Sequence, residues 1–180
     1  MKMLKLGFIG AGFISKFQIR SMTQLNNAEL VGVYSTDGAK ELQKYAQDNG
    51  VGECTVYQSI KELCNNCEAV ALYVPNHVRI EIMEQIVDAV KSGAELKGVI
   101  CEKPLARTVA EAQRLVDLAR EANLVTSYHE NQLHMPSIQK ALAQLEPEQK
   151  AMGPIALARS SEEHSGPHEP WFWDPTRQGG

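Results

Sequence analysis

The chain has 180 residues, 43% of them hydrophobic and 22% charged, and its formal net charge is −4. Composition of this kind excludes a disordered or collagen-like protein and provides for one complete apolar core and part of another. The negative charge and the absence of any basic run longer than two residues argue against a nucleic-acid partner, and no apolar run approaches the roughly 18 residues of a membrane span. We therefore expect a cytoplasmic globular protein.

The chain begins with an apolar strand at residues 4–9, followed by a glycine-rich turn and a helix. The turn is Gly10-Ala11-Gly12 and Ser15 follows, which is the G-x-G-x-x-small spacing of a dinucleotide-binding turn. Gly10 would allow the tight reversal, Gly12 would let the backbone approach a pyrophosphate, and N–H groups at the helix start would face the phosphates. Such turns also end strands that bind no ligand, so the motif alone leaves both interpretations open.

Strands and helices alternate along the residues that follow. Apolar runs predict strands at residues 30–34, 56–57, 69–74, 98–101 and 124–128. Helical periodicity or a capping signal predicts a helix between successive strands. In the last of these helices, the side chains expected to face inward are those of Val109, Ala112, Leu115, Val116 and Ala119. The alternation predicts right-handed βαβ units, and hence an α/β fold with a doubly wound parallel sheet (a Rossmann fold) over residues 1–126.

Two of these helices begin with a capping box. Ser59 and Glu62 form the first box, and Thr108 and Glu111 form the second. In each box we expect the hydroxyl to accept a hydrogen bond from the N–H of the glutamate, whose side chain reaches back to the N–H of the capping residue.

Among the four cysteines, only Cys64 and Cys67 have a suggestive C-x-x-C spacing. A zinc site would need a second pair, which the sequence lacks. A redox pair would open a helix after a strand, whereas this pair closes a helical segment and precedes a strand. We therefore expect reduced, structural thiols.

From residue 127 onward the pattern changes. Pro136 is expected to open a helix that carries Ile138, Leu142 and Leu145 on one face, and residues 155–158 are predicted to form a strand. We expect residues 127–180 to be the start of an incomplete second α/β domain. It should not fold properly alone, because a two-stranded unit is marginal in water unless further elements cover its apolar face. Limited proteolysis is expected to cut first after about residue 153 and to spare the first domain.

His164 and His168, with Glu169, could suggest a metal site. Gly and Pro between the two histidines break the helix that normally aligns such ligands, so we expect a substrate-side loop and no metal.

Glu102-Lys103-Pro104 falls at the carboxyl end of a central buried strand, where open α/β sheets bind their ligands. A lysine there could hold a substrate hydroxyl by a hydrogen bond and join in proton transfer. The alternative is a solvated ion pair at the end of a strand, without any catalytic role.

Three segments, in this order, resemble the Gfo/Idh/MocA family of NAD(P)-dependent oxidoreductases: residues 8–14, 74–76 and 101–106. The resemblance implies an N-terminal Rossmann domain and a C-terminal α/β domain whose open sheet covers the substrate. It implies hydride transfer between nicotinamide and a hydroxyl or carbonyl of a sugar, cyclitol or related polyol, by a homo-oligomer. It also implies roles for individual residues: the backbone of Gly10, Gly12, Phe13 and Ile14 would hold the pyrophosphate, Pro75 and Asn76 would lie against the nicotinamide, Glu102 would approach the ribose, and Lys103 would be the catalytic lysine.

Two departures from the family pattern bear on function. Arg79 stands where relatives usually have a histidine, and we transfer no role to His77. Gly179-Gly180 resembles the start of the glycine run that in relatives precedes an active-site Asp and His, so we expect an incomplete chain. A non-catalytic NAD(P)-binding or regulatory protein is therefore the alternative function.

The cofactor preference is predicted from the end of the second strand. An Asp there would accept both ribose hydroxyls of NAD and repel a 2′-phosphate, but Ser35 occupies this place, followed by Thr36 and Asp37. Small hydroxyls tolerate a phosphate, and Lys40 is the nearby cation. The sequence therefore favours NADP over NAD, with Asp37 as the ribose ligand in the alternative case.

Overall fold

The structure is a computed structural model that describes residues 2–179 except 162, 164 and 167–169. The chain divides into two compact units, one made of Met1–His129 with Trp171–Gly180 and the other of Glu130–Pro170. The expected loop at His164, His168 and Glu169 falls on residues outside this description. Within the described ranges, no helix is long and apolar enough to cross a membrane, and no cluster of three or more His, Cys, Asp or Glu could hold a metal ion.

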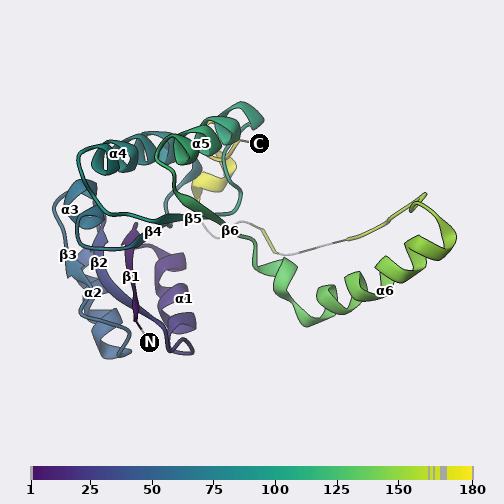
Figure 1. The fold of residues 1–180 in the computed structure, drawn as a ribbon, viewed down its shortest axis with the longest axis horizontal. Helices are drawn as coiled ribbons and strands as arrows, with labels where there is room; N and C mark the ends of the chain where they lie inside the picture. Colours follow the sequence, from purple (N-terminus) through teal and green to yellow (C-terminus); the bar gives the residue numbers. More distant parts are fainter. Residues whose placement is uncertain (1, 162, 164, 167–169, 180) are drawn as a thin grey trace. The chain divides into compact units, whose positions relative to one another are not determined.

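The first unit is built on one six-stranded parallel sheet (Figure 1). Its strands are β1 (Leu4–Ile9), β2 (Ala28–Tyr34), β3 (Thr55–Val56), β4 (Ala69–Leu72), β5 (Gly98–Glu102) and β6 (Val125–His129). Their order across the sheet is β3-β2-β1-β4-β5-β6, which reverses direction between β1 and β4. This confirms the doubly wound Rossmann sheet. β6 crosses the predicted domain boundary at residue 126, and the domain division itself stays a prediction.

Helices cover the two faces of the sheet. They are α1 (Phe13–Met22), α2 (Ala39–Asp48), α3 (Ile60–Cys64), α4 (Arg79–Lys91) and α5 (Val109–Glu121), with the 3-10 turn η1 (Asn76–Val78) before α4. One buried cluster joins α1 and α2 to the sheet, and a second joins α3, α4 and α5 to it. All four residues of β4 are buried, as its continuous apolar run predicts.

The predicted inward face of α5 is wrong at its first residue. Val109 is 87% exposed, whereas Leu115, Leu118 and Ala119 are buried. Six residues before Leu115, Val109 lies about 120° around a helix of 3.6 residues per turn and therefore faces solvent.

Both capping boxes are present, with one difference. Ser59 Oγ accepts from Glu62 N at 3.1 Å, and Thr108 Oγ1 accepts from Glu111 N at 3.2 Å, as predicted. Each glutamate, however, reaches one residue further back than expected. Glu62 accepts from the N–H of Gln58, and Glu111 accepts from the N–H of Arg107. The second box thus also holds the backbone of Arg107 in place.

All four cysteines are free and buried, which confirms their structural role. Burial raises the pKa of Cys54 and of Cys64 to about 12, and it raises the pKa of Cys67 as well. At neutral pH these thiols are protonated, so Cys64 and Cys67 do not have the thiolate that redox chemistry requires.

The second unit contains the 3-10 turn η2 (Asn131–His134) and α6 (Pro136–Met152). Pro136 is the first residue of α6, as predicted, because its missing N–H costs nothing there. The predicted apolar face of α6 is accessible to solvent, since Ile138, Leu142 and Leu145 are all exposed. The predicted strand at residues 155–158 is wrong. The segment is irregular, because no described strand pairs with it and a lone strand leaves its backbone groups unbonded.

The Glu68 carboxylate connects the beginnings of three strands. Its hydrogen bonds predict that the stability of the fold depends on pH. Its carboxylate accepts from Lys2 Nζ at 2.8 Å, from Lys97 Nζ at 2.6 Å and from Lys5 N at 3.3 Å. The hydrogen bond from Lys2, followed by those from Lys97 and Lys5, lowers the pKa of Glu68 from 4.5 to about 2. The carboxylate therefore stabilises the fold above about pH 4.5, and this contribution is lost as the pH falls towards 2.

We therefore expect Glu68→Gln to lower the free energy of unfolding at neutral pH and to lower it progressively less as the solution is acidified. Urea unfolding of both proteins between about pH 6 and about pH 2.5 measures the difference. An equal difference at both ends of this range would show that the charge of Glu68 does not stabilise the fold.

Candidate cofactor and active site

The predicted site residues gather at one edge of the sheet, where the carboxyl ends of four strands meet (Figure 1). The glycine turn follows β1, Ser35 follows β2, Pro75 follows β4, and Glu102 ends β5. The order of the sheet reverses between β1 and β4, and open α/β sheets bind ligands in the crevice at such a reversal. The structure thus brings together residues that lie as much as 93 positions apart, from Gly10 to Lys103.

The turn after β1 requires glycine at Gly10. Its φ is +103°, and a Cβ there would lie 2.3 Å from the carbonyl oxygen of Tyr73. Ser15 is buried and its hydroxyl donates to the carbonyl oxygen of Gly10 at 2.8 Å, which holds α1 close to the turn. The small residue at this position therefore serves the close helix–strand packing that its spacing predicts.

Gly12 leaves room at the start of α1. No heavy atom lies within 4 Å of the position that a Cβ would occupy, and the residue has no side chain that could cap the helix. Phe13 is exposed, and Ile14 is half-buried against the core. An open glycine before an uncapped helix start fits a pyrophosphate, because the first-turn N–H groups and the helix dipole both favour an anion.

The turn after β2 packs beside the glycine turn. A Cβ on Gly38, whose φ is +70°, would lie 3.5 Å from the carbonyl oxygen of Ala11. Ser35 is half-buried, whereas Thr36 and Asp37 are exposed, and the Asp37 carboxylate accepts from the N–H of Gly38 at 2.8 Å. Both candidate ribose ligands therefore lie on this turn.

Glu102 and Lys103 are linked through the backbone of the lysine. The Glu102 carboxylate accepts from the backbone N–H of Lys103 at 2.6 Å, and the Lys103 side chain is exposed. The lysine thus lies directly after the carboxyl end of β5 with its side chain accessible.

Arg79 lies beside these residues in a position that its place in the sequence did not predict. It opens α4 yet is only 2% exposed, and its guanidinium donates to carbonyl oxygens alone among its described hydrogen bonds. The acceptors are Glu102 O at 2.6 Å, Leu105 O at 3.1 Å, Val74 O at 3.2 Å and Pro104 O. Burial lowers the pKa of Arg79, and the nearby Cys101 and Glu102 partly offset this. The signal available in the sequence was an arginine at a position where the family pattern has a histidine.

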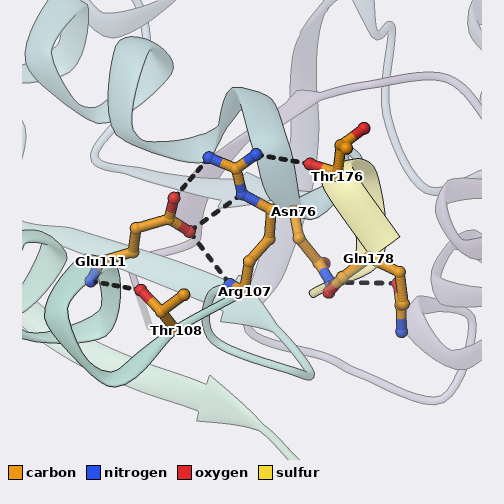
Figure 2. A network of polar contacts seen from close by, with 6 residues as sticks. All are labelled: Asn76, Arg107, Thr108, Glu111, Thr176 and Gln178. Atoms are coloured by element: carbon orange, nitrogen blue, oxygen red, sulfur yellow. Dashed lines mark hydrogen bonds and ion pairs between the residues drawn. The ribbon is translucent and has the colours of Figure 1, made fainter. Parts of the chain in front are cut away.

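Asn76 lies in the same region, but its side chain turns toward the end of the chain. It is 3% exposed, and its amide nitrogen donates to the carbonyl oxygen of Gln178 at 3.0 Å and to its Oε1 at 3.1 Å (Figure 2). Gln178 ends α7 (Pro175–Gln178), which follows the 3-10 turn η3 (Pro170–Trp173). The sequence did not predict this contact.

A second contact holds the same segment, residues 171–179, which we call the C-terminal strap. Arg107 donates to the carbonyl oxygen of Thr176 and pairs with Glu111 (Figure 2). This pair raises the pKa of Arg107 and lowers that of Glu111. Gly179, at φ +104°, packs so closely that a Cβ would lie 2.5 Å from the carbonyl oxygen of Arg107. The strap therefore lies against η1 and against Arg107, two residues before α5.

The comparison with known proteins agrees with this geometry. Residues 4–143 match the family model GFO_IDH_MocA, described as "Oxidoreductase family, NAD-binding Rossmann fold". The chain belongs to the Gfo/Idh/MocA oxidoreductase family. It is 34% identical over 129 residues to 1,5-anhydro-D-fructose reductase of Ensifer adhaerens, a match that covers 71% of this chain and 37% of that enzyme. It is also 34% identical over 123 residues to inositol 2-dehydrogenase of Klebsiella pneumoniae, covering 66% of this chain and 34% of that enzyme.

Solved structures in the same family share the fold. Myo-inositol 2-dehydrogenase from Lactobacillus plantarum superposes with a TM-score of 0.67 at 21% identity, over 82% of this chain and 42% of that one. The Gfo/Idh/MocA chain described here thus spans less than half the length of each of these relatives.

Proposed function

We propose that this chain forms the cofactor-binding part of an NAD(P)-dependent oxidoreductase acting on a hydroxyl or carbonyl of a sugar, cyclitol or related polyol. The observation that carries the proposal is one shared edge of the sheet: the open glycine turn after β1 and the Glu102-Lys103 pair after β5 flank the reversal of strand order. Relatives named as a reductase and as inositol dehydrogenases support the substrate class.

The cofactor is held mainly by backbone in this proposal. The space left at Gly12, and the N–H groups of Phe13 and Ile14 at the start of α1, suit the pyrophosphate. Pro75 and η1 would border the nicotinamide, and Glu102 would approach the ribose. Asn76 would act there through Gln178, to which its amide nitrogen is bonded. When bound, the nicotinamide accepts or supplies a hydride at C4.

Lys103 would perform the acid–base part of the reaction. Its exposed ammonium at the end of β5 can donate a hydrogen bond to the substrate oxygen and orient the carbinol carbon. In oxidation the side chain would act as the neutral amine, take up the hydroxyl proton and become the ammonium, and in reduction the ammonium would give a proton to the carbonyl oxygen and become the amine.

A panel of sugars, cyclitols and polyols, assayed with NAD and NADP by absorbance of the reduced cofactor, tests the proposal. Turnover of at least one compound is the expected result, with cofactor binding measured separately by the fluorescence of NADPH. Cofactor binding without turnover of any compound would instead support the alternative, a non-catalytic NAD(P)-binding or regulatory protein.

A homo-oligomer and a cytoplasmic location remain predictions for the protein that carries this chain, to be tested by sedimentation and by cell fractionation.

Cofactor choice should depend on Ser35. We expect NADP to bind at least as tightly as NAD, because the half-buried hydroxyl at the end of β2 carries no charge that would repel a 2′-phosphate. Ser35→Asp should shift the ratio of the two dissociation constants about tenfold or more towards NAD, through carboxylate–phosphate repulsion. Fluorescence titration with both reduced cofactors measures this ratio, and Thr36→Asp on the exposed neighbour is the matched control. A strong native preference for NAD would point to Asp37 as the ribose ligand.

A further inference from the structure

We infer that Arg79 is a positioning residue that fixes the backbone around Lys103 at the proposed hydride-transfer site. The inference rests on the proposed function of Lys103. The acceptors of its guanidinium lie on both sides of that lysine, at Glu102 O and at Pro104 O, and a further bond reaches Val74 O after β4. Arg79 therefore joins the ends of the two strands between which the substrate would lie.

Lys103 needs such an external support. Its own side chain is exposed, so the position of its Cα depends on the backbone on either side. A guanidinium presents its donors as a rigid planar fork, which can fix several carbonyl groups relative to one another at once. Lysine offers a single flexible point of contact, and methionine offers no donor.

The energetics also favour a positioning role over a stabilising one. Arg79 Nε is buried without a hydrogen-bond partner in the described part of the chain, and the residue as a whole is 2% exposed. A buried charge with an unpaired donor is costly, and an apolar side chain of similar volume often stabilises a fold as well or better. What an apolar side chain could not supply is the set of bonds to the loop of Lys103.

The test compares Arg79→Met and Arg79→Lys with Leu42→Ala. Leu42 is fully buried in α2, within the cluster that joins α1 and α2 to the sheet, and it serves as a control for lost stability alone. Each protein is first melted, and all measurements are made well below its melting temperature. Lys103 is then acetylated with a limiting reagent, with and without saturating NADP, and its modification is quantified by mass spectrometry against the exposed Lys61.

In the native protein we expect NADP to slow acetylation of Lys103 about tenfold and to leave Lys61 unchanged. In Arg79→Met and Arg79→Lys this protection should fall to about twofold or less, while NADP still binds, because the lysine is no longer held beside the cofactor. Leu42→Ala should keep the native protection. Arg79→Lys keeps the charge, so it supplies the result if Arg79→Met does not fold.

Protection that is equal in the native protein and both Arg79 variants would overturn the inference. Native Lys103 that NADP does not protect at all would overturn the proposed site itself, and the two failures are thus distinguished. Where a substrate is found, the Arg79 variants should also lose about tenfold or more in kcat with little change in the KM for cofactor.

Discussion

Lys103→Met should lower kcat by about two to four orders of magnitude and leave the affinity for NADP within about twofold, which is the range expected for loss of a general acid–base group. Methionine keeps most of the length of the lysine side chain and removes only the ammonium. Lys103 is exposed at the carboxyl end of β5, and the glycine turn lies at the corresponding end of β1. The proposed cofactor contacts are made by other residues, so binding should survive when chemistry fails.

The measurement is steady-state kinetics on the substrate identified from the panel, together with NADPH fluorescence titration. Lys61→Met is the matched control, because Lys61 is also exposed but lies on α3, which follows β3 and none of the strands that border the proposed site. Native-like turnover in Lys103→Met would remove this residue from the mechanism and would favour the solvated end-of-strand interpretation.

Gly10→Ala should both destabilise the fold and abolish cofactor binding. The added Cβ would lie 2.3 Å from the carbonyl oxygen of Tyr73, and the residue would have to remain at φ +103°. The obstacle is backbone, so it cannot move aside as a flexible side chain could. Strain at a left-handed position and the steric clash together predict a loss of roughly 2–4 kcal/mol in the free energy of unfolding.

Gly12→Ala is the informative partner of this variant. Nothing lies within 4 Å of the Cβ position at Gly12, and its φ of −81° suits any residue. The fold should therefore keep its stability, whereas the methyl group would occupy the space proposed for the pyrophosphate and weaken cofactor binding. Urea unfolding and NADPH titration of both variants separate the two effects. Unchanged cofactor affinity in Gly12→Ala would place the pyrophosphate elsewhere.

The local patterns of the sequence predicted the Rossmann sheet because each strand and helix carries its own signal. The apolar run of β4, the capping residues Ser59 and Thr108, and Pro136 at the start of α6 all act over a few residues, and the structure confirms them. The family resemblance added the identity of the chain, which composition and periodicity could not supply.

The failed strand prediction and the missed contacts depend on distant residues. The strand expected at residues 155–158 needs a partner, and no described strand pairs with it. The hydrogen bonds of Arg79 reach carbonyl groups more than 20 residues away, and the bond between Asn76 and Gln178 spans 102 residues. Periodicity cannot indicate such contacts, because they involve single polar groups and leave no repeating pattern.

The binding of the C-terminal strap to the rest of the first unit depends on its effective concentration there. It returns to the first unit only after the whole of residues 130–170, and its described side-chain bonds to that unit come from Asn76 and Arg107. While the chain is continuous, the tether holds the strap at an effective concentration near the millimolar range, so a weak contact is enough to keep it bound. One cut near residue 153, where we expect protease to act first, would turn this into a bimolecular equilibrium between the folded domain and the part of the chain that carries the strap. The strap would then dissociate on dilution, and the Asn76 amide would lose its hydrogen bonds to Gln178.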